Sequence, residues 1–271
     1  MNVHPFLAGL PRTAFIAHRG GAGAKPENTL LAFVNALTYC GADILEMDVH
    51  LTADGVLVVS HDDTVDRCTD GQGSISGMTL RDLKQLDAGY RFTTDGQEFP
   101  YRGVGIKIPT FEEVLDAFPD ARLNVEVKPD VQGLEIHFAS LIRRKDAPRR
   151  LCCGSENDAV AERLSEALPE ACHFYPRGAL TTFAEYVWSG REPPRDDRFS
   201  VAEMPLYLGD QRLSQGALAN ALRRRNKPLF VWVVDDPDEL GRLYGEGVEG
   251  VMTDRPDVLA KLLGSRALAG P

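Results

Sequence analysis

The feature of this sequence that most constrains its fold is a regular alternation of short apolar runs with longer amphipathic stretches. The apolar runs predict strands at residues 14–18, 43–49, 122–127, 150–154, 171–175, 198–204, 228–233 and 248–252. The amphipathic stretches predict helices at 28–39, 110–118, 132–144, 156–168, 179–189, 214–226, 236–245 and 256–264. Eight strands, each followed by a helix, in 271 residues predict an α/β protein with a closed (β/α)8 (TIM) barrel. An open doubly wound sheet is the alternative.

One region interrupts this alternation. Residues 52–109 contain an extra strand pattern at 56–60, one helix signal at 79–86 and otherwise loop-like sequence. A segment of that length between a strand and its helix is usually functional or forms a small subdomain. We expect a single domain over residues 1–271, with 52–109 as a small insertion after the second barrel strand, on the carboxyl rim. The aromatic residues within 62–109 predict a lid that influences substrate choice.

Composition and charge exclude several classes of function. The net charge of −10 argues against a nucleic-acid partner, which requires clustered basic residues. No run approaches the roughly 18 apolar residues that span a bilayer, and the first residues lack a signal-peptide pattern, so stable membrane insertion and export are not expected. The five cysteines are odd in number and lack CxxC spacing, which favours a reducing cytoplasm. The sequence leaves the oligomeric state open.

Acidic residues collect where two of the predicted strands end. Strand alternation places Glu46 and Asp48 on one face, and Glu126 and Lys128 share a face on the next strand. Three carboxylates converging inside a barrel repel one another unless they are protonated or bind a cation. An all-oxygen set suits a hard divalent ion, Mg²⁺ or Ca²⁺, with Mn²⁺ also possible. Structural ion pairs, including a Glu126–Lys128 salt bridge, are the alternative interpretation.

Two histidines end predicted strands at the same rim. His18 closes the first strand, and His61 closes the extra strand in the insertion. A lone strand-end histidine is more often a core residue bonded to backbone. Two imidazoles beside a metal are, however, what hydrolysis of a phosphodiester requires, since one removes a proton and the other protonates the leaving alkoxide. Arg19 and Lys128 would then offset the phosphate charge. The glycines that follow Arg19 would let the backbone pass close to the phosphate.

Several motifs together resemble the glycerophosphodiester phosphodiesterase family. His18-Arg19-Gly20 followed by Pro26-Glu27-Asn28-Thr29 is similar to its opening signature, and Glu46-Met47-Asp48-Val49 to its metal-binding strand. The stretches similar to its second histidine, its third acidic strand and its last two strands are Val58-Val59-Ser60-His61-Asp62, Asn124-Val125-Glu126-Val127-Lys128, Val231-Trp232-Val233-Val234 and Gly250-Val251-Met252-Thr253-Asp254. The resemblance implies the barrel, a divalent metal, and hydrolysis of glycerophosphodiesters to sn-glycerol 3-phosphate and an alcohol.

Other residues receive more modest expectations. Glu27 and Asn28 are expected to cap the first helix. Trp232 is expected either to pack in the core or to stack on the glycerol. Asp254 is expected to hold the last loop through bonds to backbone. Residues 145–215, which include Trp188, match the family poorly, so the alcohol specificity is left open.

Two other functions remain open from the sequence. Related barrel enzymes of the phospholipase C or sphingomyelinase D type act on different phosphodiesters, but their acidic residues or insertions differ from those here. A non-catalytic phosphodiester-binding barrel would have lost a histidine or a carboxylate, and here all are present.

Overall fold

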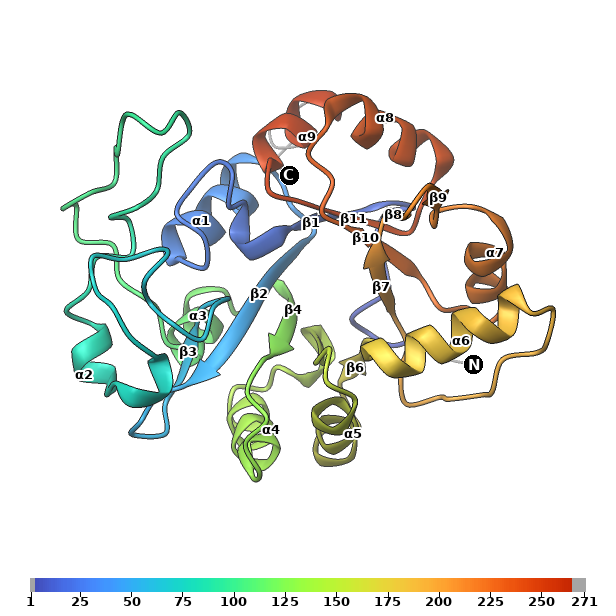
Figure 1. Cartoon of the computed structure of the whole chain (residues 1–271), viewed down its shortest axis with the longest axis horizontal. Coiled ribbons are helices and arrows are strands. Elements are labelled where there is room, and N and C mark those ends of the chain that lie inside the picture. The colour runs from blue at the N-terminus through green and yellow to red at the C-terminus, as the bar shows by residue number, and fades with distance from the viewer. Residues whose placement is uncertain (1–2, 265–271) are drawn as a thin grey trace.

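Eight parallel strands form the centre of the protein, seen in a computed structural model that describes residues 3–264. The strands are β1 Ala14–Ala17, β2 Ile44–Leu51, β4 Arg122–Val127, β5 Leu151–Gly154, β6 Cys172–His173, β7 Ala202–Pro205, β10 Leu229–Trp232 and β11 Gly250–Thr253. They are hydrogen-bonded in the order β6-β5-β4-β2-β1-β11-β10-β7, and a parallel bridge between Phe174 and Val201 joins the two end strands. The ring is visible in Figure 1. The predicted (β/α)8 barrel is confirmed.

A helix follows each of these strands on the outside of the barrel (Figure 1). These helices are α1 Leu30–Val34, α3 Phe111–Ala117, α4 Leu134–Arg144, α5 Asp158–Ala167, α6 Arg177–Trp188, α7 Gly216–Arg224, α8 Pro237–Glu246 and α9 Pro256–Leu262. Side-chain caps explain where several begin. Thr110, Asn157 and Asp236 each accept hydrogen bonds from the first turn of α3, α5 and α8, respectively, which satisfies donors that have no partner within the helix.

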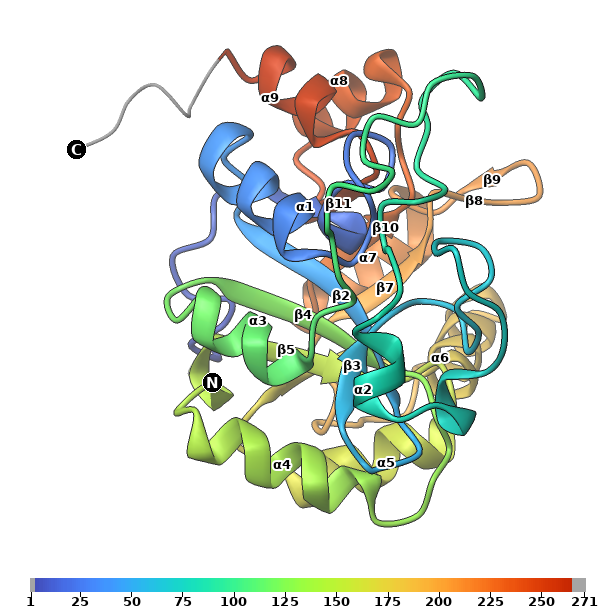
Figure 2. The ribbon, with the colours of Figure 1, turned by 90° about the vertical axis from the view of Figure 1, so that its left-hand side faces the viewer.

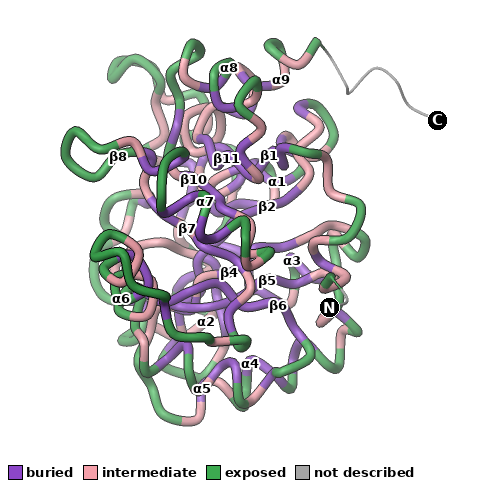
Figure 3. Tube along the Cα trace, turned by 90° about the vertical axis from the view of Figure 1, so that its right-hand side faces the viewer, coloured by how far each residue is buried: buried purple, intermediate pink, exposed green. Residues whose placement is uncertain are grey.

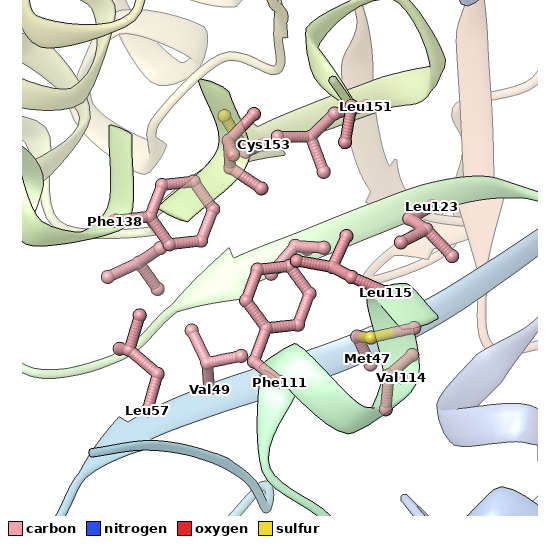
Figure 4. Packing of buried hydrophobic residues seen from close by; sticks show 14 of the residues in the cluster. Met47, Val49, Leu57, Phe111, Val114, Leu115, Leu123, Phe138, Leu151 and Cys153 are labelled. Atoms are coloured by element: carbon pink, nitrogen blue, oxygen red, sulfur yellow. The ribbon is translucent and has the colours of Figure 1, made fainter. Parts of the chain in front are cut away.

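Strand alternation separates an outer apolar layer from an inner face. Met47 and Val49 of β2 point outward and pack with Phe111 of α3 and Phe138 of α4, as Figure 4 shows. Burying each such side chain contributes roughly 1.5–3 kcal/mol, so this layer holds the helices on the barrel. Figure 3 shows the same division, with buried strands surrounded by more exposed helices and loops. The inner positions of β2 are therefore free for polar groups at the carboxyl end of the barrel.

The segment between β2 and α3 has its own small core. It contains β3 Leu57–Val59, which pairs antiparallel with β2, a 3₁₀ turn at Ile75–Gly77 and α2 Leu80–Leu83. A separate apolar cluster, which includes Val58, Ile75 and Leu83, supports these elements. Figure 2 shows them with their long loops on one side of the barrel. Helix α2 is shorter than the 79–86 that the sequence predicts.

A short hairpin lies outside the barrel sheet. A hairpin of β8 Tyr207–Leu208 and β9 Gln211–Arg212 follows β7; it was not predicted, because strands of two residues leave no periodic signal. Within residues 3–264, the structure has no helix with the length and apolar character needed to cross a membrane.

Candidate active site

A cavity of about 500 Å³ opens at the carboxyl ends of the barrel strands. All eight residues that the sequence analysis singled out line it: His18, Arg19, Glu46, Asp48, His61, Glu126, Lys128 and Trp232. They come from the ends of β1, β2, β4 and β10 and from the loop after β3, because carboxyl ends of parallel strands meet at one rim. The structure therefore brings the predicted residues together, while their chemical roles remain predictions.

His18 follows β1 and is held by a carboxylate from the opposite end of the chain. Its Nδ1 lies 2.7 Å from Asp254 Oδ1, and its Nε2 lies 3.9 Å from Glu46 Oε2. Burial disfavours the imidazolium, but the charges of Glu46 and Asp254 and the hydrogen bond to Asp254 outweigh that cost, so the pKa of His18 is raised. The expectation that the Asp254 side chain bonds to the backbone of the last loop was wrong, because its carboxylate binds His18. The backbone N–H of Asp254 donates to the carboxylate of Asp235.

His61 is oriented by a neighbouring carboxylate in a similar way. Its Nδ1 lies 2.7 Å from Asp62 Oδ1, and Arg67 donates to the same carboxylate. The bond from Arg67 is the main reason that the pKa of Asp62 is lowered to about 2. Arg67 also donates two hydrogen bonds to Glu27, at 2.6 and 2.8 Å. Through Arg67, the loop that carries His61 is tied to the loop after β1.

The loop after β1 corrects two expectations. Thr29, and not Glu27 or Asn28, caps α1 by accepting the N–H of Ala32. Glu27 binds Arg19 and Arg67, and Asn28 donates 3.1 Å to Asp48 Oδ2. Glu27 and Asn28 therefore contact residues of the site, and Thr29 caps the helix in their place.

The turn at Arg19 places its backbone N–H against the site. Arg19 has a φ of 51°, in the left-handed region, and its N–H donates 2.7 Å to Glu46 Oε2. Gly20 follows with a φ of 78°, and a Cβ there would lie 2.8 Å from both Ala32 and Phe33. Glycine is required at this position by the close approach of α1. The close approach of α1 thus gives Gly20 a packing reason, and close passage of this backbone by a phosphate stays a prediction.

Carboxylates and one ammonium group form the floor of the cavity. Lys128 Nζ lies 3.1 Å from Asp48 Oδ1 and 2.6 Å from Glu126 Oε2. Burial and the charge of Asp48 raise the pKa of Glu46 to about 7, and burial raises that of Glu126. Burial would lower the pKa of Lys128, but Asp48 and Glu126 outweigh it and raise the value. The predicted Glu126–Lys128 salt bridge is present, and it lies inside the site.

A fourth carboxyl group of the cavity was missed by the sequence analysis. Glu203 of β7 lines the same cavity and accepts a hydrogen bond of 2.7 Å from Asn124 Nδ2. Burial raises the pKa of Glu203 to about 8. The signal was available, because an ionisable residue within the predicted strand 198–204 has to face either the core or the barrel interior.

The wall of the cavity away from these charges is apolar. It is formed by side chains of α6, the β8–β9 hairpin, α7 and neighbouring strands, including Leu180, Ala184, Trp188, Leu208, Leu213 and Leu218. Trp232 lines the same cavity and packs in part against the inner core cluster, so the expectation of core packing holds in part, and stacking on the glycerol stays a prediction.

The insertion contributes less to the cavity than predicted. Of its described residues, His61 lines the cavity, whereas Tyr90, Phe92, Phe99 and Tyr101 do not. Phe92 packs edge-on against Tyr101, and Arg102 lies over the rings of Tyr90 and Phe99. These rings therefore form no part of the cavity wall in this structure, because they pack on one another and on Arg102, and a role of the insertion in substrate choice stays a prediction.

The arrangement has the groups that cleavage of a phosphodiester needs. Two imidazoles are each oriented by a carboxylate, and the cationic side chains of Arg19 and Lys128 line the same cavity, each within 4 Å of Asp48. All the anionic ligands for a metal are oxygen atoms, which suits a hard cation. Among residues 3–264, no three His, Cys, Asp or Glu side chains are gathered into a ready metal-binding group, since Lys128 bridges Asp48 and Glu126.

Comparisons with known proteins agree on one family. The sequence model described as the glycerophosphoryl diester phosphodiesterase family matches residues 18–258. A glycerophosphodiester phosphodiesterase of Caldanaerobacter subterraneus subsp. tengcongensis is 33% identical over 258 residues, which cover 93% of this chain and 98% of the relative. A lysophospholipase D of Homo sapiens is 28% identical over 273 residues, which cover 92% of this chain and 85% of the relative.

Solved structures agree with these sequence comparisons. The glycerophosphoryl diester phosphodiesterase domain of a Mycobacterium tuberculosis protein has a TM-score of 0.81 at 26% identity, covering 93% of this chain and 98% of that one. An Oleispira antarctica phosphodiesterase, solved in complex with the product sn-glycerol-3-phosphate, has a TM-score of 0.71 at 26% identity and covers 94% of this chain and 97% of its own.

Proposed function

This chain belongs to the glycerophosphoryl diester phosphodiesterase family, and we propose from this membership and its site that it hydrolyses glycerophosphodiesters to sn-glycerol 3-phosphate and an alcohol. The observation that carries the proposal is the meeting of His18 and His61 with Arg19 and Lys128 in one cavity at the carboxyl rim. A binding module without catalysis has no need of two imidazoles that are each oriented by a carboxylate.

The two histidines divide the proton transfers. One takes a proton from the attacking water, and the other gives a proton to the alkoxide that leaves from phosphorus. Asp254 holds His18 and Asp62 holds His61 through their Nδ1 atoms, which leaves each Nε2 for the reaction. A neutral imidazole can accept a proton and an imidazolium can donate one, so two histidines suit both tasks.

The substrate phosphate is held by cationic side chains. Arg19 and Lys128 line the cavity beside the buried carboxylates, and their charge offsets that of the phosphodiester as negative charge grows on its oxygens. Arg19 is fixed by its bond of 3.1 Å to Glu27 and by the left-handed turn of its backbone. Trp232, at the apolar side of the same cavity, is proposed to contact the glycerol carbons.

We propose that Glu46, Asp48 and Glu126 hold a divalent cation, Mg²⁺ or Ca²⁺, with Mn²⁺ as a further possibility. The residues fit such an ion in two respects. Their donor atoms are all oxygen, and Glu46 lies close enough to Asp48 that the charge of Asp48 adds to burial in raising the pKa of Glu46. When bound, the ion would polarise the phosphoryl oxygens.

The test is release of glycerol 3-phosphate from glycerophosphocholine, measured with and without EDTA. We expect release that EDTA abolishes and that added Mg²⁺ or Ca²⁺ restores. His18→Ala and His61→Ala should each reduce turnover on the order of 10²–10⁴-fold, the usual effect of losing an acid–base group. Parent rates in both variants would refute the assignment, and full turnover in metal-stripped protein would refute the metal.

A substrate with a nitrophenolate leaving group separates the two roles. Nitrophenolate departs with little need of a proton, so loss of the acid should slow this substrate much less than glycerophosphocholine. Loss of the base should slow both substrates equally. Equal behaviour of the two histidine variants would contradict a division of labour.

Two further expectations accompany the proposal. Residues 52–109 are proposed to form a subdomain inserted in a single-domain chain, supported by their separate apolar cluster. The cytoplasm is proposed as the location, because all five cysteines, which lie in the described part of the chain, are free thiols and four of them are buried. Cell fractionation with antibody detection tests the location.

A further inference from the structure

A second cavity, outside the catalytic one, is lined by the end of α6, by α7 and by the loop of residues 189–201. This loop precedes β7, and residues 225–228 precede β10, so the cavity lies at the amino end of the strands, opposite the catalytic rim. Of the residues that the structure describes, Tyr175 alone lines both cavities. We propose that the second cavity binds an organic phosphate, a small molecule with a phosphate monoester and an uncharged organic part. The inference goes beyond the proposed function and does not depend on it.

Cationic side chains outnumber acidic ones around this second cavity. The cations that line it are Arg191, Arg195, Arg224, Arg225 and Lys227, and the acidic residues are Glu192, Asp196 and Asp197. The whole chain, by contrast, has a net charge of −10. Asp196 is also paired with Arg198, which does not line the cavity. A locally positive cavity on an acidic protein attracts anions.

A single carboxylate, that of Glu192, lies among three of the guanidinium groups. Its hydrogen bond with Arg225, together with the charges of Arg225, Arg224 and Arg195, lowers the pKa of Glu192. The side chain of Glu192 is 85% exposed, so it can move away from the arginines without uncovering apolar surface. A carboxylate offers one negative charge to three guanidinium groups. A phosphate monoester offers up to two charges and three acceptor oxygens, which suits several arginines better.

The other two half-buried or rim cations, Lys227 and Arg191, contact only neutral groups directly. Lys227 Nζ donates to the backbone carbonyls of Phe199 and Asp196, and burial lowers the pKa of Lys227. Arg191 Nε donates 2.9 Å to Ser189 Oγ, and its guanidinium group lies 4.3 Å from the centre of the Tyr186 ring. Neutral partners leave a positive charge uncompensated, so an anion placed in the cavity gains from both side chains.

The second cavity also has room and apolar surface for an organic part. Its volume of about 1170 Å³ is at least that of pockets that enclose small organic ligands, and far more than a bare phosphate ion fills. Leu7, Val187, Ala217 and Ala221 line it beside the cations. The loop of residues 189–201 has no helix or strand of its own, and loops of this length are usually functional. These features favour an organic phosphate over inorganic phosphate.

Adenosine monophosphate is the probe, because it is a phosphate monoester with an uncharged organic part and contains no phosphodiester to cleave. Its binding to the whole protein is measured by isothermal titration calorimetry at low ionic strength, since salt screens exposed arginines. We expect adenosine, which lacks the phosphate, and inorganic phosphate, which lacks the organic part, each to bind about tenfold or more weakly than the probe. Inorganic phosphate that binds as tightly as the probe would overturn the assignment of an organic phosphate.

Variants connect the binding to the arginines. Arg195→Gln combined with Arg224→Gln removes two exposed guanidinium groups, so it should weaken binding of the probe by about tenfold or more. Glu192→Gln removes the competing carboxylate and should tighten binding by about threefold or more. The matched control combines Arg144→Gln with Arg149→Gln, which changes the net charge equally. Both control residues are exposed, near the end of α4, and do not line the second cavity.

Lys128→Gln distinguishes the two cavities, because Lys128 lines only the catalytic one of the two. Weaker binding in the double variant of Arg195 and Arg224, with binding kept in the control and in Lys128→Gln, supports the inference. Loss of binding in Lys128→Gln with full binding in that double variant would place the probe in the catalytic cavity and overturn it. An equal loss in the control would show only general attraction between charges, which also overturns it, as would no binding at about 1 mM probe. The titrations measure no hydrolysis, so either proposal can fail without the other.

Discussion

At the scale of single residues, the site is organised by carboxylates that orient histidines. The bond of 2.7 Å between His18 and Asp254 joins residues separated by 236 positions, and it fixes the ring in one orientation. Asp254 also contributes to the raised pKa of His18. In the proposed mechanism Asp254 would be a positioning residue, because it contacts His18 and would act on the substrate through that ring.

Replacing Asp254 by Asn should therefore change both rate and pH dependence. We expect Asp254→Asn to lower turnover by about tenfold or more, but by less than loss of the imidazole itself. Removing the charge lowers the pKa of His18, so the limb of the pH profile of kcat/KM that reports this residue should move to lower pH. Asp238→Asn, in the exposed first turn of α8, is the control. A loss of rate with an unmoved limb would indicate a purely structural role.

Glu203, which lines the cavity, leads to a prediction about stability. Burial raises its pKa from 4.5 to about 8, so its folded state retains a proton that the unfolded chain releases. Such a group contributes stability below the unfolded pKa, and this contribution is lost as pH rises through about 8. Glu203→Gln keeps the acceptor for Asn124 but cannot ionise. The variant should match the parent near pH 5 and be more stable at pH 9 by a few kcal/mol, at about 1.4 kcal/mol per unit of pKa.

Thermal unfolding at both pH values measures this difference. For a chain of about this size, each kcal/mol corresponds to about 2–4 °C in Tm. A Tm difference between variant and parent that stays the same at pH 5 and pH 9 would contradict the titration of Glu203.

At the scale of elements, the insertion supplies His61, and its outer loop lies away from the cavity. Replacing the exposed residues 94–98 by two glycines should leave kcat/KM within about twofold of the parent, because none of these described residues lines the cavity. The ratio of rates for glycerophosphocholine and glycerophosphoethanolamine should also be unchanged. The measurement is steady-state kinetics with both substrates. A changed ratio would show that the loop closes over the substrate during turnover.

At the scale of the whole molecule, the closed ring of strands holds four carboxyl groups in one interior, of which Glu46 and Asp48 are buried and Glu126 and Glu203 are half-buried. Their repulsion is offset in part by Lys128. A bound divalent cation should stabilise the fold by mass action, by about 2.7 kcal/mol at a hundredfold excess over Kd. The expected rise in Tm is about 5–10 °C.

Glu126→Gln is the matched test of this stabilisation. The variant removes one proposed ligand while keeping the shape of the side chain, so the rise in Tm on adding Mg²⁺ or Ca²⁺ should largely disappear. The readout needs no turnover and is therefore independent of catalysis. An equal rise in parent and variant would place the ion elsewhere.

The sequence by itself determined the architecture and eight of the residues that line the cavity, although it did not indicate Glu203. Period-2 alternation placed Glu46 and Asp48 on the inner face of a strand, and the position of His18 at a strand end placed it on the rim, since both depend on local geometry. The expectations for Glu27, Asn28 and Asp254 failed because their partners, Arg67, Asp48 and His18, are distant along the chain.

Only the tertiary structure decided what surrounds the phosphate site. The aromatic residues of the insertion looked suited to a lid, but they pack with one another, whereas α6 and a hairpin of two-residue strands line the apolar wall. Barrel closure sets which side chains share a cavity, and it depends on contacts between strands far apart in sequence. Local periodicity predicts which side chains share one face of a strand or helix. Which residues contact that face depends on how the whole chain packs.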